Sequence, residues 1–245
     1  SVKVIECNLR ASRSFPFVSK VTGTNYVAEA TRRMLGIKQA INNTSLDLEH
    51  VGVKVPMFSF ARLAGADPML GVEMASTGEV GCLGEDLHEA LLHALLATGF
   101  RFPHKGVLLS LGRMVDKYWF SDEAHRIAEQ LGLPIFATEG TSEMLSEIGI
   151  ASTRVGKTRD EEPSALALIE NGTVDLVINI PRGYDELGRP DGYLIRRQAV
   201  EAGVPLLTDL PLARAVIAAL CERRVGSLKI RAWNDYLATA RVANH

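Results

Sequence analysis

Three polar residues near the start of the chain have a spacing that could hold a metal ion and a phosphate. Glu6, Asn8 and Arg10 alternate with other residues along an apolar stretch that we interpret as a strand over 2–9. Side chains two residues apart share one face of a strand, so these three would point the same way. A carboxylate and an amide oxygen suit Mg²⁺, and an adjacent arginine suits the phosphate that accompanies it. The plainer alternative is an exposed edge strand with a salt bridge.

A second set of polar residues follows the strands that we expect in the other half of the chain. Ligands of open α/β sheets bind just beyond the carboxyl ends of the strands. Residues 138–141 lead into an expected helix, whose first backbone amides favour an anion. The hydrogen-bond donors expected along this edge are Ser110, Lys117, Thr138, Thr141, Lys157, Thr158, Asn179 and Thr208. They predict a pocket for a phosphate or carboxylate, although helix capping and solvation would account for each residue taken singly.

The pattern from residue 102 onward predicts the sheet that would position this second set. Apolar runs alternate with helical patterns, with strands at 107–111, 134–137, 151–155, 174–179 and 204–207 and helices at 122–131, 142–148, 163–170, 193–202 and 212–221. Such alternation predicts an α/β fold with a parallel five-stranded sheet flanked by helices on both faces.

Residues 1–101 are less regular than the second half of the chain. Besides the strand at 2–9, their pattern predicts a strand at 51–55, helices at 25–34 and 87–97, and a loop or hairpin over 71–84.

Two familiar nucleotide-binding signatures are incomplete or absent. Residues 151–158 approach the pattern G-x-x-x-x-G-K-[ST], but Ala151 stands at its first glycine and the residues between form the expected strand itself. A phosphate loop needs its glycine-rich loop between a strand and a helix. No G-x-G-x-x-G follows a strand, so the sequence also argues against a Rossmann dinucleotide site.

Composition excludes several classes of protein. The 245 residues carry 27 Lys and Arg against 29 Asp and Glu, a formal net charge of −2. This balance gives no electrostatic reason to expect nucleic acid or an anionic membrane as a partner. The three cysteines are far apart, so we expect no disulfide framework or zinc site, and a reducing, cytoplasmic location. Because Ser1 runs at once into the first strand, we expect the chain to be a piece of a longer protein.

The segment around the first polar set resembles a known family. Residues 4–20, which read VIECNLRASRSFPFVSK, resemble the end of the second ATP-grasp domain of the carbamoyl phosphate synthetase large subunit. Residues 53–71 and 73–81 look like later parts of that domain. Residues 102–245 resemble the family's C-terminal regulatory domain, which has the methylglyoxal synthase-like fold. The resemblance covers essentially the whole chain and implies two domains, an ATP-grasp remnant over 1–101 and a regulatory domain over 102–245.

The resemblance also implies roles for residues that match family motifs. In the ATP-grasp part, Glu6 and Asn8 match magnesium ligands, Arg10 matches a nucleotide-phosphate contact, and Arg13 matches a further arginine of the catalytic motif. In the regulatory part, the residues that match positions holding an allosteric effector are Ser110, Lys117, Thr138, Thr141, Lys157 and Asn179.

The identity of the effector is narrowed by two departures from known patterns. Pro181 stands where the nucleotide-responsive bacterial enzymes usually have a hydrogen-bonding residue, and the acetylglutamate-responsive relatives carry a Trp near the position of Lys157, where this sequence has none. The resemblance favours a nucleotide or another phosphorylated metabolite.

Taken as a whole, the resemblance implies an ATP-dependent ligase in full-length form. That enzyme makes carbamoyl phosphate from bicarbonate and glutamine or ammonia, for pyrimidine and arginine biosynthesis, with ATP and Mg²⁺ or Mn²⁺. The chain lacks the glycine-rich loop and the main ATP-grasp lobes, so we expect it alone to be inactive and to bind no cofactor tightly. The expected partners are the rest of the large chain, a glutaminase small subunit and an anionic effector, with no nucleic acid and no membrane.

Two alternatives stay open on the sequence alone. A methylglyoxal synthase would need a carboxylate base, which would fall on Glu162, and a histidine in the loop 182–191, which contains none. A stand-alone ligand-sensing module of the same fold would need only the pocket.

Overall fold

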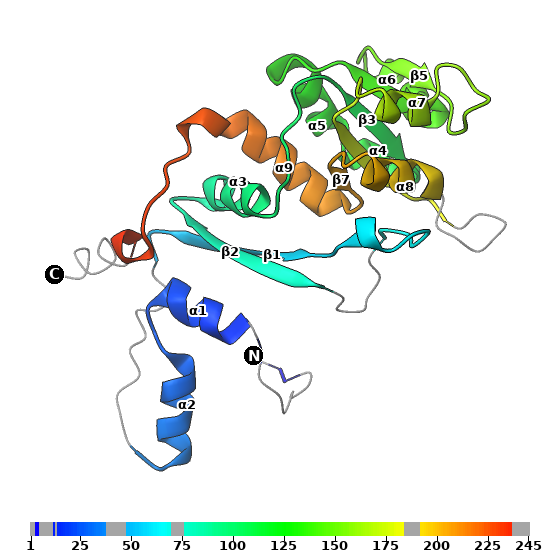
Figure 1. Ribbon diagram of the computed structural model, residues 1–245. Helices are drawn as coiled ribbons and strands as arrows, with labels where there is room; N and C mark the ends of the chain where they lie inside the picture. The colour runs from blue at the N-terminus through cyan, green and yellow to red at the C-terminus, as the bar shows by residue number, and fades with distance from the viewer. Residues whose placement is uncertain are drawn as a thin grey trace.

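The structure, a computed structural model, describes residues 3, 4, 12, 14–37, 48–69, 76–183 and 192–236. Within these ranges the chain forms a two-stranded antiparallel sheet and a five-stranded parallel sheet, which packed helices join (Figure 1). The strand expected over residues 2–9 lies almost wholly outside the described residues.

The smaller sheet is sandwiched between helices. β1 (Val51–Met57) pairs antiparallel with β2 (Gly78–Gly84), so the second half of the expected loop over 71–84 is a strand. α3 (Leu87–Ala97) covers one face of the pair and α1 (Ser14–Thr22) the other (Figure 1). The approach of α1 requires glycine at 81, because a Cβ there would lie 2.4 Å from the Phe17 ring.

The remaining elements of this half confirm two expected helices. α2 (Tyr26–Met34) begins after Asn25, whose side chain accepts a hydrogen bond from the Ala28 amide at 3.0 Å. α3 begins after Asp86, which caps the Glu89 amide in the same way at 2.9 Å. Such side-chain oxygens satisfy amides that the first helical turn leaves unpaired. A short 3₁₀ helix, η2 (Phe60–Arg62), follows β1.

The larger sheet confirms the predicted parallel five-stranded architecture. Its strand order is β5-β4-β3-β6-β7 and every neighbouring pair is parallel. The strands are β3 (Val107–Leu111), β4 (Ile135–Thr138), β5 (Thr153–Val155), β6 (Leu176–Ile180) and β7 (Leu206–Leu207). All residues of β3 and β6 are buried, as expected for central strands with helices on both faces.

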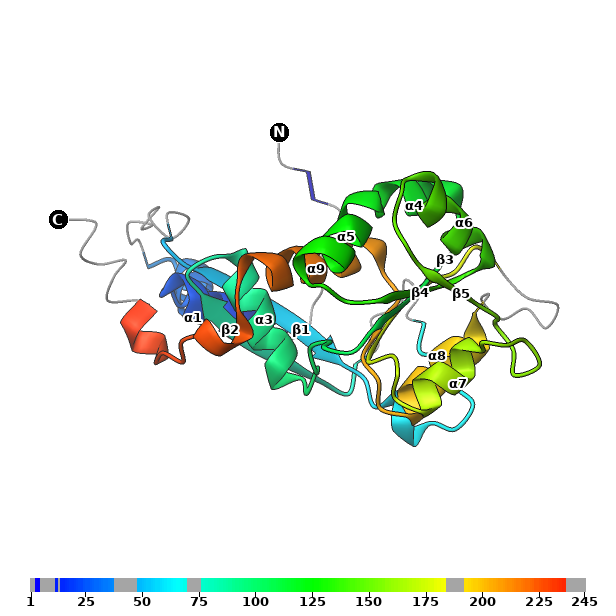
Figure 2. The same cartoon turned by 90° about the horizontal axis from the view of Figure 1, so that it is seen from above.

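Helices cover both faces of the larger sheet. α4 (Met114–Trp119), α5 (Ser121–His125) with its π-helical continuation η3 (Arg126–Gln130), α6 (Glu139–Glu147) and α9 (Leu210–Glu222) lie on one face (Figure 2). α7 (Ala165–Glu170) and α8 (Tyr193–Glu201) lie on the other. No helix in the described ranges is both long and apolar enough to cross a membrane.

α6 begins at Glu139, three residues before the predicted start at 142. Two other helices differ from the sequence-based expectation for identifiable reasons. α7 begins at Ala165 instead of residue 163, because the Gly156 amide donates to the Pro163 carbonyl at 2.9 Å and holds 163–164 in a bridge. α4 is not predicted at all. Its burial pattern is inverted, with Asp116 and Lys117 buried and Tyr118 and Trp119 largely exposed, so it has no apolar face for a pattern to reveal.

One hydrophobic core runs from the smaller sheet into the larger one. Leu91, Leu92 and Leu95 of α3 belong to the same buried cluster as Val216 and Ile217 of α9 and the central strands of the parallel sheet. α9 therefore packs between α3 and the parallel sheet, as Figure 2 shows.

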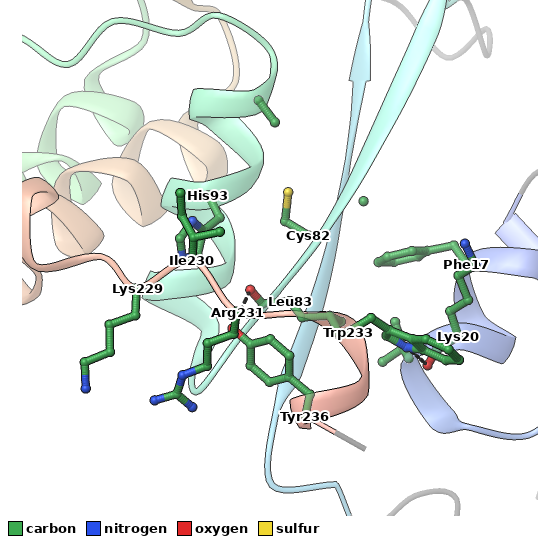
Figure 3. Close-up of a pocket in the computed structure, with 13 residues that line it drawn as sticks. Phe17, Lys20, Cys82, Leu83, His93, Lys229, Ile230, Arg231, Trp233 and Tyr236 are labelled. Atoms are coloured by element: carbon green, nitrogen blue, oxygen red, sulfur yellow. Dashed lines mark hydrogen bonds between the residues drawn. The ribbon is translucent and has the colours of Figure 1, made fainter. Parts of the chain in front are cut away.

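The segment after α9 returns to the smaller sheet. It passes through η4 (Val225–Ser227) and then runs beside β2 and α1 (Figure 3). The Trp233 Nε1–H donates to the Lys20 carbonyl at 2.7 Å, and Arg231 pairs with Glu85. Together with α1, α3 and β2, this segment lines an open pocket of about 470 Å³.

We predict that the contact of α3 with the shared core is a main source of stability. Leu92→Ala, at a side chain with no exposure, should lower the free energy of unfolding by about 2–5 kcal/mol. Leu96→Ala, one turn later and 41% exposed, should change it by no more than about 0.5 kcal/mol. Urea unfolding measures both values, and equal losses would contradict this account of the core.

Candidate functional site

The first polar set cannot be placed on the fold. Glu6, Asn8, Arg10 and Arg13 lie outside the residues that the structure describes. Their expected roles in binding metal and nucleotide stay predictions.

Three members of the second set lie on adjacent strands at the carboxyl edge of the parallel sheet. Ser110 of β3 is directly opposite Asn179 of β6, and the Thr138 hydroxyl at the end of β4 donates to the Ser110 hydroxyl at 3.4 Å. All three residues are buried. The structure thus brings Ser110, Thr138 and Asn179 together, as the strand-end rule predicts.

Thr141 joins this group through the backbone of β3. It lies in the first turn of α6, where its hydroxyl accepts from the Leu111 amide at 3.0 Å and donates to the Leu111 carbonyl at 3.2 Å. The side chain is 1% exposed. Thr141 therefore fixes the start of α6 against β3, and its expected contact with an effector stays a prediction.

Lys117 brings a buried positive charge to the same edge. Its Nζ donates to the Gly140 carbonyl in the first turn of α6 at 2.5 Å. Burial lowers the pKa of Lys117 below its usual value, and the positive charges of Arg182 and Lys157 lower it further, against an opposing effect of Glu143. An anion placed between these positive charges would stabilise the charged form of each.

Lys157 lies at the border of a hollow beyond β5. The hollow has a volume of about 630 Å³ and is lined by Glu139, Arg154, Val155, Gly156, Lys157, Glu161 and Glu162. Arg154 pairs with Glu139, and the backbone amide of Lys157 donates to the Glu161 carboxylate at 2.7 Å. The Lys157 side chain is exposed. This end of the edge therefore has mixed charge.

The full predicted set is too wide for one pocket. Thr208 follows β7 and Lys157 follows β5, the two outermost strands of the sheet. With neighbouring strands about 4.8 Å apart, the ends of these two strands are separated by roughly 19 Å. The residues that contact one another or lie opposite one another are Ser110, Thr138 and Asn179. Lys117 contacts the first turn of α6, and Lys157 lies at the far strand β5.

Two arginines at this edge are not among the predicted site residues. Arg182 comes two residues after β6, and its backbone lies so close to Gly112 that a Cβ on that glycine would be 2.3 Å from the Arg182 nitrogen. The strand-end rule could have found it. Arg196 of α8 donates to the Asn179 Oδ1 at 2.6 Å, and no local pattern points to this contact.

The histidine that an alternative enzyme would need is missing from the described residues that line the hollow beside Glu162. His104 pairs with Asp175 at 3.0 Å, and Asp175 comes just before β6. That pair therefore lies at the opposite, amino-terminal edge of the sheet.

Comparison with known proteins gives a consistent result. A family model described as "MGS-like domain" matches residues 123–208. The chain is similar to the multifunctional protein URA2 of Saccharomyces cerevisiae, 45% identical over 89% of this chain and 10% of that protein. It is also similar to the human protein "carbamoyl-phosphate synthase (ammonia), mitochondrial", 41% identical over 97% of this chain and 16% of that protein. A third relative is the multifunctional protein pyr-3 of Neurospora crassa, 43% identical over 91% of this chain and 13% of that protein. The chain thus spans only a small part of the length of these relatives.

We predict that the two buried threonines at this edge contribute very differently to stability. Thr141→Val leaves the buried Leu111 amide without its partner, which should cost about 1–3 kcal/mol of unfolding free energy. Thr138→Val removes only a long hydroxyl contact and should cost less than about 1 kcal/mol. Urea unfolding of the two isosteric variants decides the question. Equal values would mean that the contact of Thr141 with β3 does not hold α6 in place.

Proposed function

Because the chain belongs to the carbamoyl-phosphate synthase family, as a homologue of one segment of those longer proteins, we propose that it is the regulatory end of an ATP-dependent ligase. The parent protein makes carbamoyl phosphate from bicarbonate and glutamine or ammonia. It feeds pyrimidine and arginine biosynthesis from the cytoplasm. In support, the relatives are named as carbamoyl-phosphate synthases or as multifunctional proteins, and they match nearly the whole chain.

We propose different roles for the two halves of the chain. Residues 1–101 complete the ATP-grasp domain, in which Glu6 and Asn8 hold Mg²⁺ while Arg10 and Arg13 contact the nucleotide. Residues 102–245 bind the effector. The rest of the large chain is the principal partner, and a glutaminase subunit supplies nitrogen where glutamine is the donor.

We propose that the effector is an anionic small molecule, a nucleotide or another phosphorylated metabolite. The observation that carries this proposal is the buried cation Lys117, whose Nζ donates to the first turn of α6 at the carboxyl edge of the sheet. Arg182 and Lys157 follow two other strands at the same edge, with Glu143 also close enough to act on Lys117. The first turn of α6 lies beside Lys117 and adds backbone amides that favour an anion. The buried hydroxyl of Ser110 accepts from Thr138 and keeps its own proton as a further donor.

We predict that Lys157→Ala weakens effector binding without unfolding the protein. The probes are nucleoside monophosphates and ribose 5-phosphate, screened against the unmodified chain by calorimetry. A hydrogen bond to a charged group contributes about 1.5–3 kcal/mol, so the dissociation constant of a probe that binds should rise roughly 10- to 150-fold. Lys157 is exposed, so the circular dichroism of the variant should match that of the unmodified chain.

Lys105→Ala is the matched control for this experiment. Lys105 is also exposed and lies at the opposite edge of the sheet, where its amide donates to Asp175 and its Nζ to the Gly172 carbonyl at 3.1 Å. Its removal changes the net charge equally but should leave the affinity unchanged. Equal weakening by both variants would indicate only a long-range charge effect, and no weakening by Lys157→Ala would place the anion elsewhere.

A further inference from the structure

Arg196 of α8 joins two parts of the molecule that are far apart in the sequence. Its side chain has no solvent-exposed surface. Nη1 donates to the Asn179 Oδ1 at 2.6 Å, while Nε and Nη2 donate to the two carboxylate oxygens of Asp67 at 2.7 and 2.6 Å. Asn179 belongs to the candidate edge, and Asp67 belongs to the segment 58–69 that follows β1. One buried guanidinium therefore contacts both.

The contact with Arg196 determines which part of the Asn179 amide remains for a ligand. A guanidinium only donates hydrogen bonds, so the amide oxygen must face Arg196. The amide nitrogen, with its two N–H donors, is then left for other partners. Gly192 confines the amide from a second side, because a Cβ on that glycine would lie 2.5 Å from the Asn179 Nδ2. Asn179 is thus held as a donor, which suits an anion.

The segment 58–69 is held on α8 by two further side chains. Arg197 donates from Nη1 to the carbonyls of Leu63 and Ala66 at 3.3 and 3.0 Å. The Tyr193 hydroxyl donates to the Gly65 carbonyl at 2.8 Å. These residues hold the same segment as Arg196, but their contacts with it do not involve Asn179. Arg197 is therefore a natural control for the part that Arg196 plays.

We propose that Arg196 is a positioning residue that couples the effector edge to the segment 58–69. This inference rests on the proposed function, because Asn179 is its link to the effector. An anion that accepts from the Asn179 amide polarises it and strengthens the bond that its oxygen receives from Arg196. The pairing with Asp67 then carries this change to the segment 58–69. Coupling between two sites is reciprocal, so order in that segment also favours effector binding.

A first experiment tests the link without any ligand. Hydrogen exchange of the backbone amides in 58–69 is measured relative to that of β1, so that a global loss of stability cancels. Asn179→Ala should raise the relative exchange by about fivefold or more, the low end of coupling between sites. Thr138→Ala, whose hydroxyl contacts Ser110 and not Arg196, should leave it unchanged. Unchanged exchange in Asn179→Ala would overturn the proposal.

A second experiment tests the link with a bound probe, using the nucleoside monophosphate or ribose 5-phosphate that the unmodified chain binds in calorimetry. The probe should slow exchange in 58–69 in the unmodified chain and in Arg197→Lys. In Arg196→Lys this protection should be lost and the probe should bind at least about fivefold more weakly. Asp67→Asn, which leaves Arg196 unsubstituted but removes its charge partner, should act in the same direction.

The two experiments separate this inference from the proposed function. If no probe binds the unmodified chain, the effector function fails, and exchange in Asn179→Ala still decides whether the link exists. If a probe binds and protects 58–69 equally in Arg196→Lys and Arg197→Lys, the effector function stands and the role of Arg196 is overturned.

Discussion

The packing of α9 between α3 and the parallel sheet is the contact on which the arrangement of both halves depends. An isolated two-stranded sheet such as β1–β2 is at best marginally stable in water. Here it is anchored because the leucines of α3 enter the same core as Val216 and Ile217 of α9. That core also contains the central strands β3 and β6. The smaller sheet is therefore positioned by the larger one.

Buried polar groups fix how individual helices sit on the sheet, which apolar packing alone does not determine. A buried donor or acceptor without a partner costs more than an ordinary hydrogen bond contributes, so each must be satisfied in one geometry. The Thr141 hydroxyl hydrogen-bonds to the backbone of β3, and the Lys117 Nζ donates to the first turn of α6. Arg196 donates to Asp67 and to Asn179. The edge that offers donors to an anion is thus built from groups that also hold its helices in place.

The sequence predicts the parallel sheet because its strands are short apolar runs bounded by helices, and this signal is local. It predicts the meeting of Ser110, Thr138 and Asn179 for the same reason. It does not predict α4, whose buried Asp116 and exposed Trp119 invert the usual pattern. Nor does it reveal that Thr208 lies far from Lys157, since strand order is not encoded locally. The ion pair of Arg196 with Asp67 joins residues that are 129 positions apart, so no local periodicity in the sequence indicates it.

The return of the segment around Trp233 to α1 has a consequence for the order in which the protein is completed during translation. Trp233 and Lys20 are 213 positions apart, and a ribosome adds about 5–20 residues per second. Roughly 10–40 s therefore pass between the synthesis of the two residues. Throughout that interval α1 and β2 lack the side chains that close over them (Figure 3). Within the described residues, α1 is thus made early and covered late, and the apolar surface that it shares with β2 is open to chaperones in the meantime.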